Sequence, residues 1–135
     1  MSINYNVGIG GDINTKEGLT IYLYDKEKIG HIKLYNFDFL EIIHNEIYKN
    51  LPEDLILNCN NTTICLDLFI NENFRKKGIG KKLLELSLSE SKKFNVDYWV
   101  GCRDKNNYLS KNIIESIKPE KIIESEKIFI YIKKI

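Results

Sequence analysis

Alternating apolar and polar residues divide the first third of the chain into short strands and one helix. Leu19 to Tyr24 alternates apolar and aromatic positions, Ile29 to Tyr35 repeats the pattern, and the charged run between them predicts a β-hairpin. Phe37 to Leu51 carries apolar residues at helical spacing and is followed by Pro52, so we expect one helix there. Ile3 to Ile9 predicts a shorter first strand that ends at two glycines.

The central strand is expected from Thr63 to Ile70, and a helix from Lys81 to Phe94. Because side chains alternate across a strand, the pattern predicts two faces. The first face is expected to carry Ile64, Leu66, Leu68 and Ile70, and the second Cys65, Asp67 and Phe69.

The remaining elements alternate between strand and helix. Val96 to Cys102 reads as a buried strand, and a helix that starts near Asn107 carries an apolar stripe. Two closing strands follow, at Ile122-Ile123 and at Ile128 to Ile132. The alternation predicts an α/β (α+β) domain in which a mixed sheet has helices on both faces, and a single unit over residues 1–135.

A basic, glycine-bearing turn, Arg75 to Gly80 (RKKGIG), joins the central strand to its helix. Gly78 and Gly80 let the backbone approach a ligand closely, and the first N–H groups of the helix have no intrahelical partner. An anion can approach the backbone at the glycines and accept hydrogen bonds from these N–H groups. The helix dipole and the nearby cations also favour a negative charge there. No G-K-[ST] follows, and Leu83 stands where a dinucleotide fingerprint has its third glycine. A solvated basic turn that caps a helix is the alternative.

The string RKKGIGKKLLE resembles the acetyl-coenzyme A signature of the GNAT N-acetyltransferase superfamily, [R/Q]-x-x-G-x-[G/A], at Arg75, Gly78 and Gly80. The order of elements can be followed from Leu19 to Ile135, whereas the first eighteen residues fit poorly. The resemblance implies a GNAT-like, mostly antiparallel sheet flanked by helices. The N-terminal part is reduced, and a helix is inserted between strands 3 and 4.

The resemblance also implies acetyl transfer from acetyl-coenzyme A to a primary amine by direct attack on the thioester. Backbone N–H groups around Phe69 and Ile70 would polarise the thioester carbonyl. The implied cofactor contacts in the loop and the second helix are Arg75, Lys76, Lys77, Gly78, Ile79, Gly80, Lys81 and Asn107.

Asp67 is the candidate general base, because it lies on the central strand eight residues before Arg75. The alternative for Asp67 is a strand-end residue bonded to backbone or to a lysine. Cys65 as an acyl-carrying nucleophile is less favoured than Cys65 as a small buried residue.

The sequence departs from the family where a tyrosine usually protonates the leaving thiolate. In the pattern N-x-x-A-x-x-x-Y, counting from Asn107 places Ile114 at the tyrosine position, and counting from Asn106 places Ile113 there. Two functions stay open: an active N-acetyltransferase, or a non-catalytic acetyl-CoA/CoA-binding module that acts through a protein partner. The acceptor, a small-molecule or protein amine, also stays open.

The composition of the chain limits which ligands and which cellular compartment are expected. The chain has 20 basic and 19 acidic residues, a net charge of +1, so bulk nucleic-acid binding is not expected, although a charged RNA is one acceptor considered. Neither a membrane-spanning run nor a signal peptide is evident. Three cysteines without a C-x-x-C pair predict free thiols in the cytoplasm: Cys59, Cys65 and Cys102. His31 and His44 lack metal-ligand spacing, so no metal site is expected. A homodimer stays open.

Overall fold

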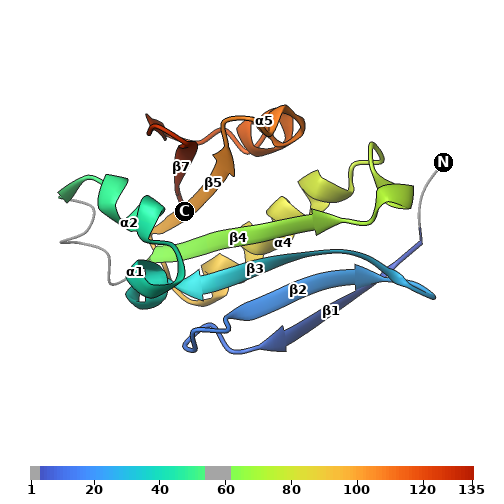
Figure 1. Cartoon of the computed structure of the whole chain (residues 1–135). Coiled ribbons are helices and arrows are strands. Elements are labelled where there is room, and N and C mark those ends of the chain that lie inside the picture. Colours follow the sequence, from blue (N-terminus) through green and yellow to red (C-terminus); the bar gives the residue numbers. More distant parts are fainter. Residues whose placement is uncertain (1–3, 54–61) are drawn as a thin grey trace.

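The computed structural model describes residues 4–53 and 62–135, so Cys59 lies outside the described residues. The described strands form one seven-stranded sheet in the order β1-β2-β3-β4-β5-β7-β6 (Figure 1). All neighbouring strands are antiparallel except β4 and β5, which are parallel. The predicted mixed, mostly antiparallel sheet is therefore confirmed.

The N-terminal strands are β1 (Asn6–Gly11), β2 (Leu19–Tyr24) and β3 (Lys28–Asn36). The predicted hairpin is present, with Ile21 paired to Ile32, and β2 has the predicted bounds. Residues 12–18 connect β1 to β2 by a turn in which the Asp12 amide donates to the Gly18 carbonyl at 3.2 Å. This turn contains no helix, as expected for a reduced N-terminal part.

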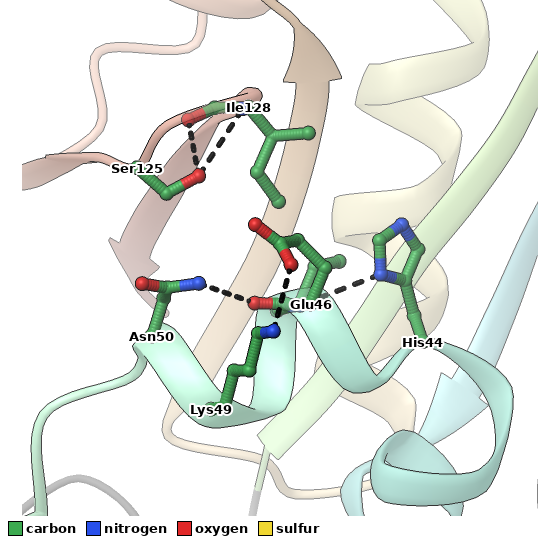
Figure 2. Close-up of polar contacts among 7 residues, drawn as sticks. His44, Glu46, Lys49, Asn50, Ser125 and Ile128 are labelled. Carbon is green, nitrogen blue, oxygen red and sulfur yellow. Dashed lines mark hydrogen bonds and ion pairs between the residues drawn. The ribbon is translucent and has the colours of Figure 1, made fainter.

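The helical segment between β3 and β4 is broken, which corrects the prediction of one helix over Phe37 to Leu51. It consists of a 3-10 turn η1 (Phe37–Phe39), α1 (Leu40–Ile43) and α2 (Asn45–Asn50). His44 interrupts the helix at φ −150° and ψ 80°, and its Nδ1 accepts a hydrogen bond from the Ile47 amide at 3.4 Å (Figure 2). His44 caps a new helix, so the helical spacing of the apolar residues continues although the helical backbone is interrupted.

The second half contains the predicted elements with small shifts at their ends. The order is β4 (Thr62–Ile70), a 3-10 turn η3 (Glu72–Phe74), α4 (Ile79–Lys93), β5 (Tyr98–Asp104), α5 (Tyr108–Glu115), β6 (Lys121–Glu124) and β7 (Ile128–Lys134). Among the helices of the described ranges, none combines the length and apolarity that a bilayer crossing requires.

Two apolar cores lie on opposite faces of the sheet. One contains Leu83 and Leu84 of α4 together with Ile114, at the face that α4 and α5 cover. The other contains Leu40 of α1 and Ile47 of α2. Helices therefore cover both faces, but α1 and α2 lie only at the end where β3 finishes and β4 begins (Figure 1).

Buried hydrogen bonds fix α4 against the middle of the sheet. The Thr63 and Ser91 hydroxyls lie 2.7 Å apart, and the Trp99 indole N–H donates to the Ser87 hydroxyl at 3.1 Å. Trp99, Ser87 and Ser91 are completely buried. Because these bonds tie α4 to both β4 and β5, they also fix the loop that precedes α4.

Candidate active site

A β-bulge at Asp67 interrupts the central strand. Lys33 of β3 pairs with Leu66 and His31 pairs with Phe69, so β4 has one residue more than β3 between these pairs. Asp67 has φ 57°, in the left-handed region that aspartate and asparagine tolerate better than most residues. The extra residue shifts the phase of the strand from this point onward.

The bulge makes the predicted faces of the central strand wrong beyond Leu66. Leu66 packs in the core of α1 and α2, as Ile64 does, whereas Leu68 and Ile70 pack against the core of α4. Phe69 stacks on His31 on the face opposite α4. A strict period of two cannot anticipate this change, because the bulge inserts a residue without changing the apolar pattern.

The two parallel strands separate next to the bulge. β4 and β5 pair only from Thr62 to Cys65 and from Tyr98 to Gly101, and then diverge (Figure 1). A small cavity of about 50 Å³ lies at this opening. Its lining includes Cys65, Leu66, Asp67 and Leu68 of β4, Gly101 and Cys102 of β5, and Ile113 and Ile114 of α5.

An adjacent groove of about 430 Å³ extends from the opening to the basic loop. Its lining brings together half of the residues proposed from the sequence as cofactor contacts: Phe69, Ile70, Arg75, Lys76 and Asn107. Leu68 and Ile113 complete the lining, and the sequence did not predict them as cofactor contacts. Lys77, Gly78 and Lys81 are exposed on the same loop and helix start, whereas Ile79 and Gly80 are buried.

The loop conformation depends on its glycines and on one arginine. Gly78 caps α4 at φ 79°, and a Cβ built there would meet no protein atom within 4 Å, so the backbone faces open space. A Cβ at Gly80 would lie 3.0 Å from methyl groups of both Ile70 and Ile113, so Gly80 allows α4, β4 and α5 to meet. The Arg75 Nε donates to the Ile70 carbonyl at 3.1 Å and ties the loop to β4.

Asp67 and Tyr35 form a polar pair beside the opening. Asp67 is exposed, whereas Tyr35 is 4% exposed. Burial raises the pKa of Tyr35, and the charge of Asp67 and a hydrogen bond to its carboxylate raise this pKa further. Tyr35 therefore stays a protonated phenol at neutral pH and orients the carboxylate.

His31 lies on the same strand face as Tyr35. Burial lowers the pKa of His31, and Lys28 and Lys33 lower it further against an opposing effect of Asp67. Its ring stacks on Phe69 at 5.5 Å between centroids. We did not propose His31 or Tyr35 as site residues from the sequence. His31, Lys33 and Tyr35 stand at every second position of β3, and this spacing is the sequence pattern that could have indicated a shared strand face.

The two described cysteines are poor nucleophiles. Burial, followed by the charges of Asp104 and Asp67, raises the pKa of Cys102 to about 12. Burial also raises the pKa of Cys65 far above its ordinary range. Because the thiolate is the reactive form, an acyl-cysteine intermediate is disfavoured at neutral pH. Among the described residues, no group of three or more histidine, cysteine or acidic side chains is placed to hold a metal ion.

The central strand is bulged and parts from its parallel neighbour, and a glycine loop at a helix start follows it. This arrangement defines a fold class with a groove beside a basic loop that suits an anion. The sequence matches the model of the acetyltransferase (GNAT) family over residues 8–112. The chain belongs to this family. No curated protein matches the sequence.

Solved structures agree on the fold at low sequence identity. A Bacillus subtilis acetyltransferase solved with CoA is similar at a TM-score of 0.69 and 12% identity, over 98% of this chain and 99% of that one. A GNAT-family acetyltransferase from Streptococcus pneumoniae has a TM-score of 0.62 and 10% identity, over 90% and 68% of the two chains. A Salmonella typhimurium protein solved with its cofactor acetyl-CoA has a TM-score of 0.60 and 11% identity, over 89% and 65%.

Proposed function

We propose that this protein is a single-domain N-acetyltransferase that transfers an acetyl group from acetyl-CoA to a primary amine. The observation that carries the proposal is the continuity between the basic loop, the groove and the opening beside Asp67. A ligand held by its phosphates at Arg75 to Lys81 can extend along the groove, so that its reactive end reaches the bulge. The CoA and acetyl-CoA complexes of similar folds support this choice of ligand.

The loop residues fit a pyrophosphate. Gly78 presents its backbone to open space, and the exposed cations Arg75, Lys76 and Lys81 surround it. The N–H groups at the start of α4 lack intrahelical acceptors and carry the positive end of the helix dipole. Asn107 and Ile113 line the far wall of the groove. Ile79 and Gly80 are buried at the start of α4, and Gly80 permits the close packing of α4, β4 and α5.

Asp67 takes the proton in the proposed reaction. The ammonium form of the acceptor loses a proton to the Asp67 carboxylate, directly or through water, and the free amine attacks the thioester carbonyl carbon. The C–N bond forms, the C–S bond breaks, and the thiolate leaves and is protonated to CoA. Backbone N–H groups at the end of β4, around Phe69 and Ile70, stabilise the negative charge that develops on the carbonyl oxygen.

Ile114 is the observation that favours the second candidate, a non-catalytic CoA-binding module. Ile114 is 5% exposed and lines the cavity at the opening, and Ile113 lies beside it. Neither side chain can donate a proton, so the leaving thiolate would take its proton from water. The enzyme remains the preferred function, because Asp67 lines the opening and Arg75 and Lys76 line the adjacent groove.

Thiol release tests the two candidates against each other. The protein is incubated with acetyl-CoA and a panel of amines, and free CoA is measured with a thiol reagent after the amine is added. Amine-dependent release, with the acetylated amine identified by mass spectrometry, supports the enzyme. Binding of acetyl-CoA without release for any amine supports the binding module.

A further inference from the structure

The sheet face opposite α4 is left open along β2, β3 and the end of β4, and we call it the open face. Its members are Tyr22, Lys28, His31, Lys33, Asp67 and Phe69. Because α1 and α2 lie at the far end of these strands, no described helix covers this part of the sheet (Figure 1). Phe69 is accordingly 45% exposed.

Aromatic rings form the floor of the open face. His31 and Phe69 stack with an interplanar angle of 28°, and Tyr22 pairs with His31 on the neighbouring strand. The Tyr22 and Tyr24 rings lie 5.6 Å apart. An exposed aromatic floor next to a polar reaction centre is suited to the apolar part of a small ligand.

Two lysines give this floor a positive side. The Lys28 ammonium lies 5.9 Å from the centre of the Phe69 ring, and Lys33 lies between His31 and Tyr35 along β3. Neither lysine belongs to an ion pair among the described residues. His31 adds no charge near neutral pH, since burial and both lysines lower its pKa.

Asp67 and Glu17 are acidic groups whose charges both reach the Tyr35 hydroxyl. The open face therefore presents the Asp67 carboxylate at the opening, and the ammonium groups of Lys28 and Lys33, which form no ion pair among the described residues; all three act on His31. This pattern complements a zwitterion, whose ammonium faces Asp67 and whose carboxylate faces the lysines.

We propose that the acceptor is a small α-amino acid-type amine with an apolar or aromatic side chain. Its carboxylate is held by Lys33 and Lys28, and its side chain lies on Phe69. The proposal rests on the proposed function. Polyamines fit poorly because the same lysines repel their additional positive charges, and a protein lysine or a peptide N-terminus lacks the adjacent carboxylate.

The proposed reaction needs no reactant other than the amino acid and acetyl-CoA. The amino acid ammonium loses a proton to Asp67 or water, its nitrogen forms the amide bond, and the C–S bond of the thioester breaks. The products are the N-acetyl amino acid and CoA, with one proton released to solvent.

The test compares L-phenylalanine with L-phenylalaninamide and with spermidine, by thiol release at a fixed acetyl-CoA concentration. The amide keeps the side chain and the amine but lacks the carboxylate. Its amine is also less basic, so a preference for the acid is not caused by ionisation of the amine. We expect kcat/KM for the acid to exceed that for the amide by about ten-fold, the effect of one charge-assisted contact.

Two variants complete the test. Lys33→Gln should reduce the acid-to-amide preference about ten-fold, whereas Lys26→Gln, an exposed lysine at the tip of the same hairpin, should not change it. Equal or better use of the amide or spermidine would overturn the proposal, as would acetyl-CoA binding without turnover of the acid. A protein that does not bind acetyl-CoA would overturn the proposed function itself, and this proposal with it.

Discussion

The two faces of β4 differ in what they present. The face towards α4 is apolar, and Leu68, Ile70 and Gly80 pack closely where the strand, the loop and the helices meet. The open face carries titratable and aromatic groups, among them Asp67 and His31, and no described helix covers it (Figure 1). In the proposed function, one face fixes the geometry of the loop and groove, and the other provides the groups that select and deprotonate the amine.

This difference assigns separate tasks to the two faces. Changes to the loop on the α4 side should alter cofactor binding for every acceptor. Changes on the open face should alter turnover or acceptor preference and leave cofactor affinity near its native value. The first two variants below test this separation directly, and the next two test the role of one residue each. They are given from the largest expected effect to the smallest.

Gly78→Asp should have the largest effect, a loss of acetyl-CoA affinity of about a hundred-fold or more, because it places a negative charge beside the pyrophosphate. Gly78→Asn is the matched control. Asparagine has the same shape, tolerates the φ of 79° better than most residues and has no charge. Calorimetric titration of both variants measures the effect, and equal affinities would mean that phosphate does not lie at this loop.

Asp67→Asn should lower kcat about a hundred-fold, within the usual range for the loss of a general base. Asparagine is chosen because the bulge holds residue 67 at φ 57°, which alanine adopts less readily. Steady-state kinetics together with acetyl-CoA titration separate turnover from binding. An unchanged kcat would show that bulk water or another group accepts the proton.

Ile114→Tyr should raise turnover about ten-fold if protonation of the leaving thiolate limits the native protein. A larger side chain at this buried position also costs about 1–3 kcal/mol of stability. Ile114→Phe reproduces the added bulk without the hydroxyl, so the ratio of kcat between the two variants isolates the proton donor. A ratio of one would mean that thiolate protonation does not limit the rate.

The effect of His31 on the pH dependence of stability should be the smallest of the four. Its pKa is lowered in the folded protein, so the unfolded chain binds more protons as the pH falls below about 6.5. This site therefore reduces stability at acid pH and has no such effect above that range. His31→Phe keeps an aromatic ring against Phe69 and removes the titration. The melting temperature of the variant should fall less than that of the native protein between pH 7.5 and pH 5.5, and parallel declines would contradict the assignment.

The sequence was most informative where structure is local. The bounds of β2 agree residue for residue, and the strand, loop and helix around Arg75 to Gly80 follow from periodicity and glycine placement. The resemblance to the GNAT superfamily came from that same local string, and the family model matches residues 8–112. The pairing of Tyr35 with Asp67 could not be inferred, because it depends on the register of β3 against β4.

Two errors have a common physical cause. The bulge at Asp67 and the break at His44 both change the backbone without changing the apolar pattern. In each case a polar residue interrupts the regular element: Asp67 at φ 57° in the strand, and His44 as the cap of a new helix. The hydrophobic period can be read from the sequence, but the positions where the backbone departs from a regular strand or helix cannot.

The most direct measurement is calorimetric titration of the native protein with acetyl-CoA, CoA and ATP. We expect saturable binding of acetyl-CoA and CoA and much weaker binding of ATP, because the part of CoA that ATP lacks is proposed to lie in the groove from the loop to the opening. No binding of acetyl-CoA, or equal affinity for ATP, would contradict the claim that this loop and groove form an acetyl-CoA site.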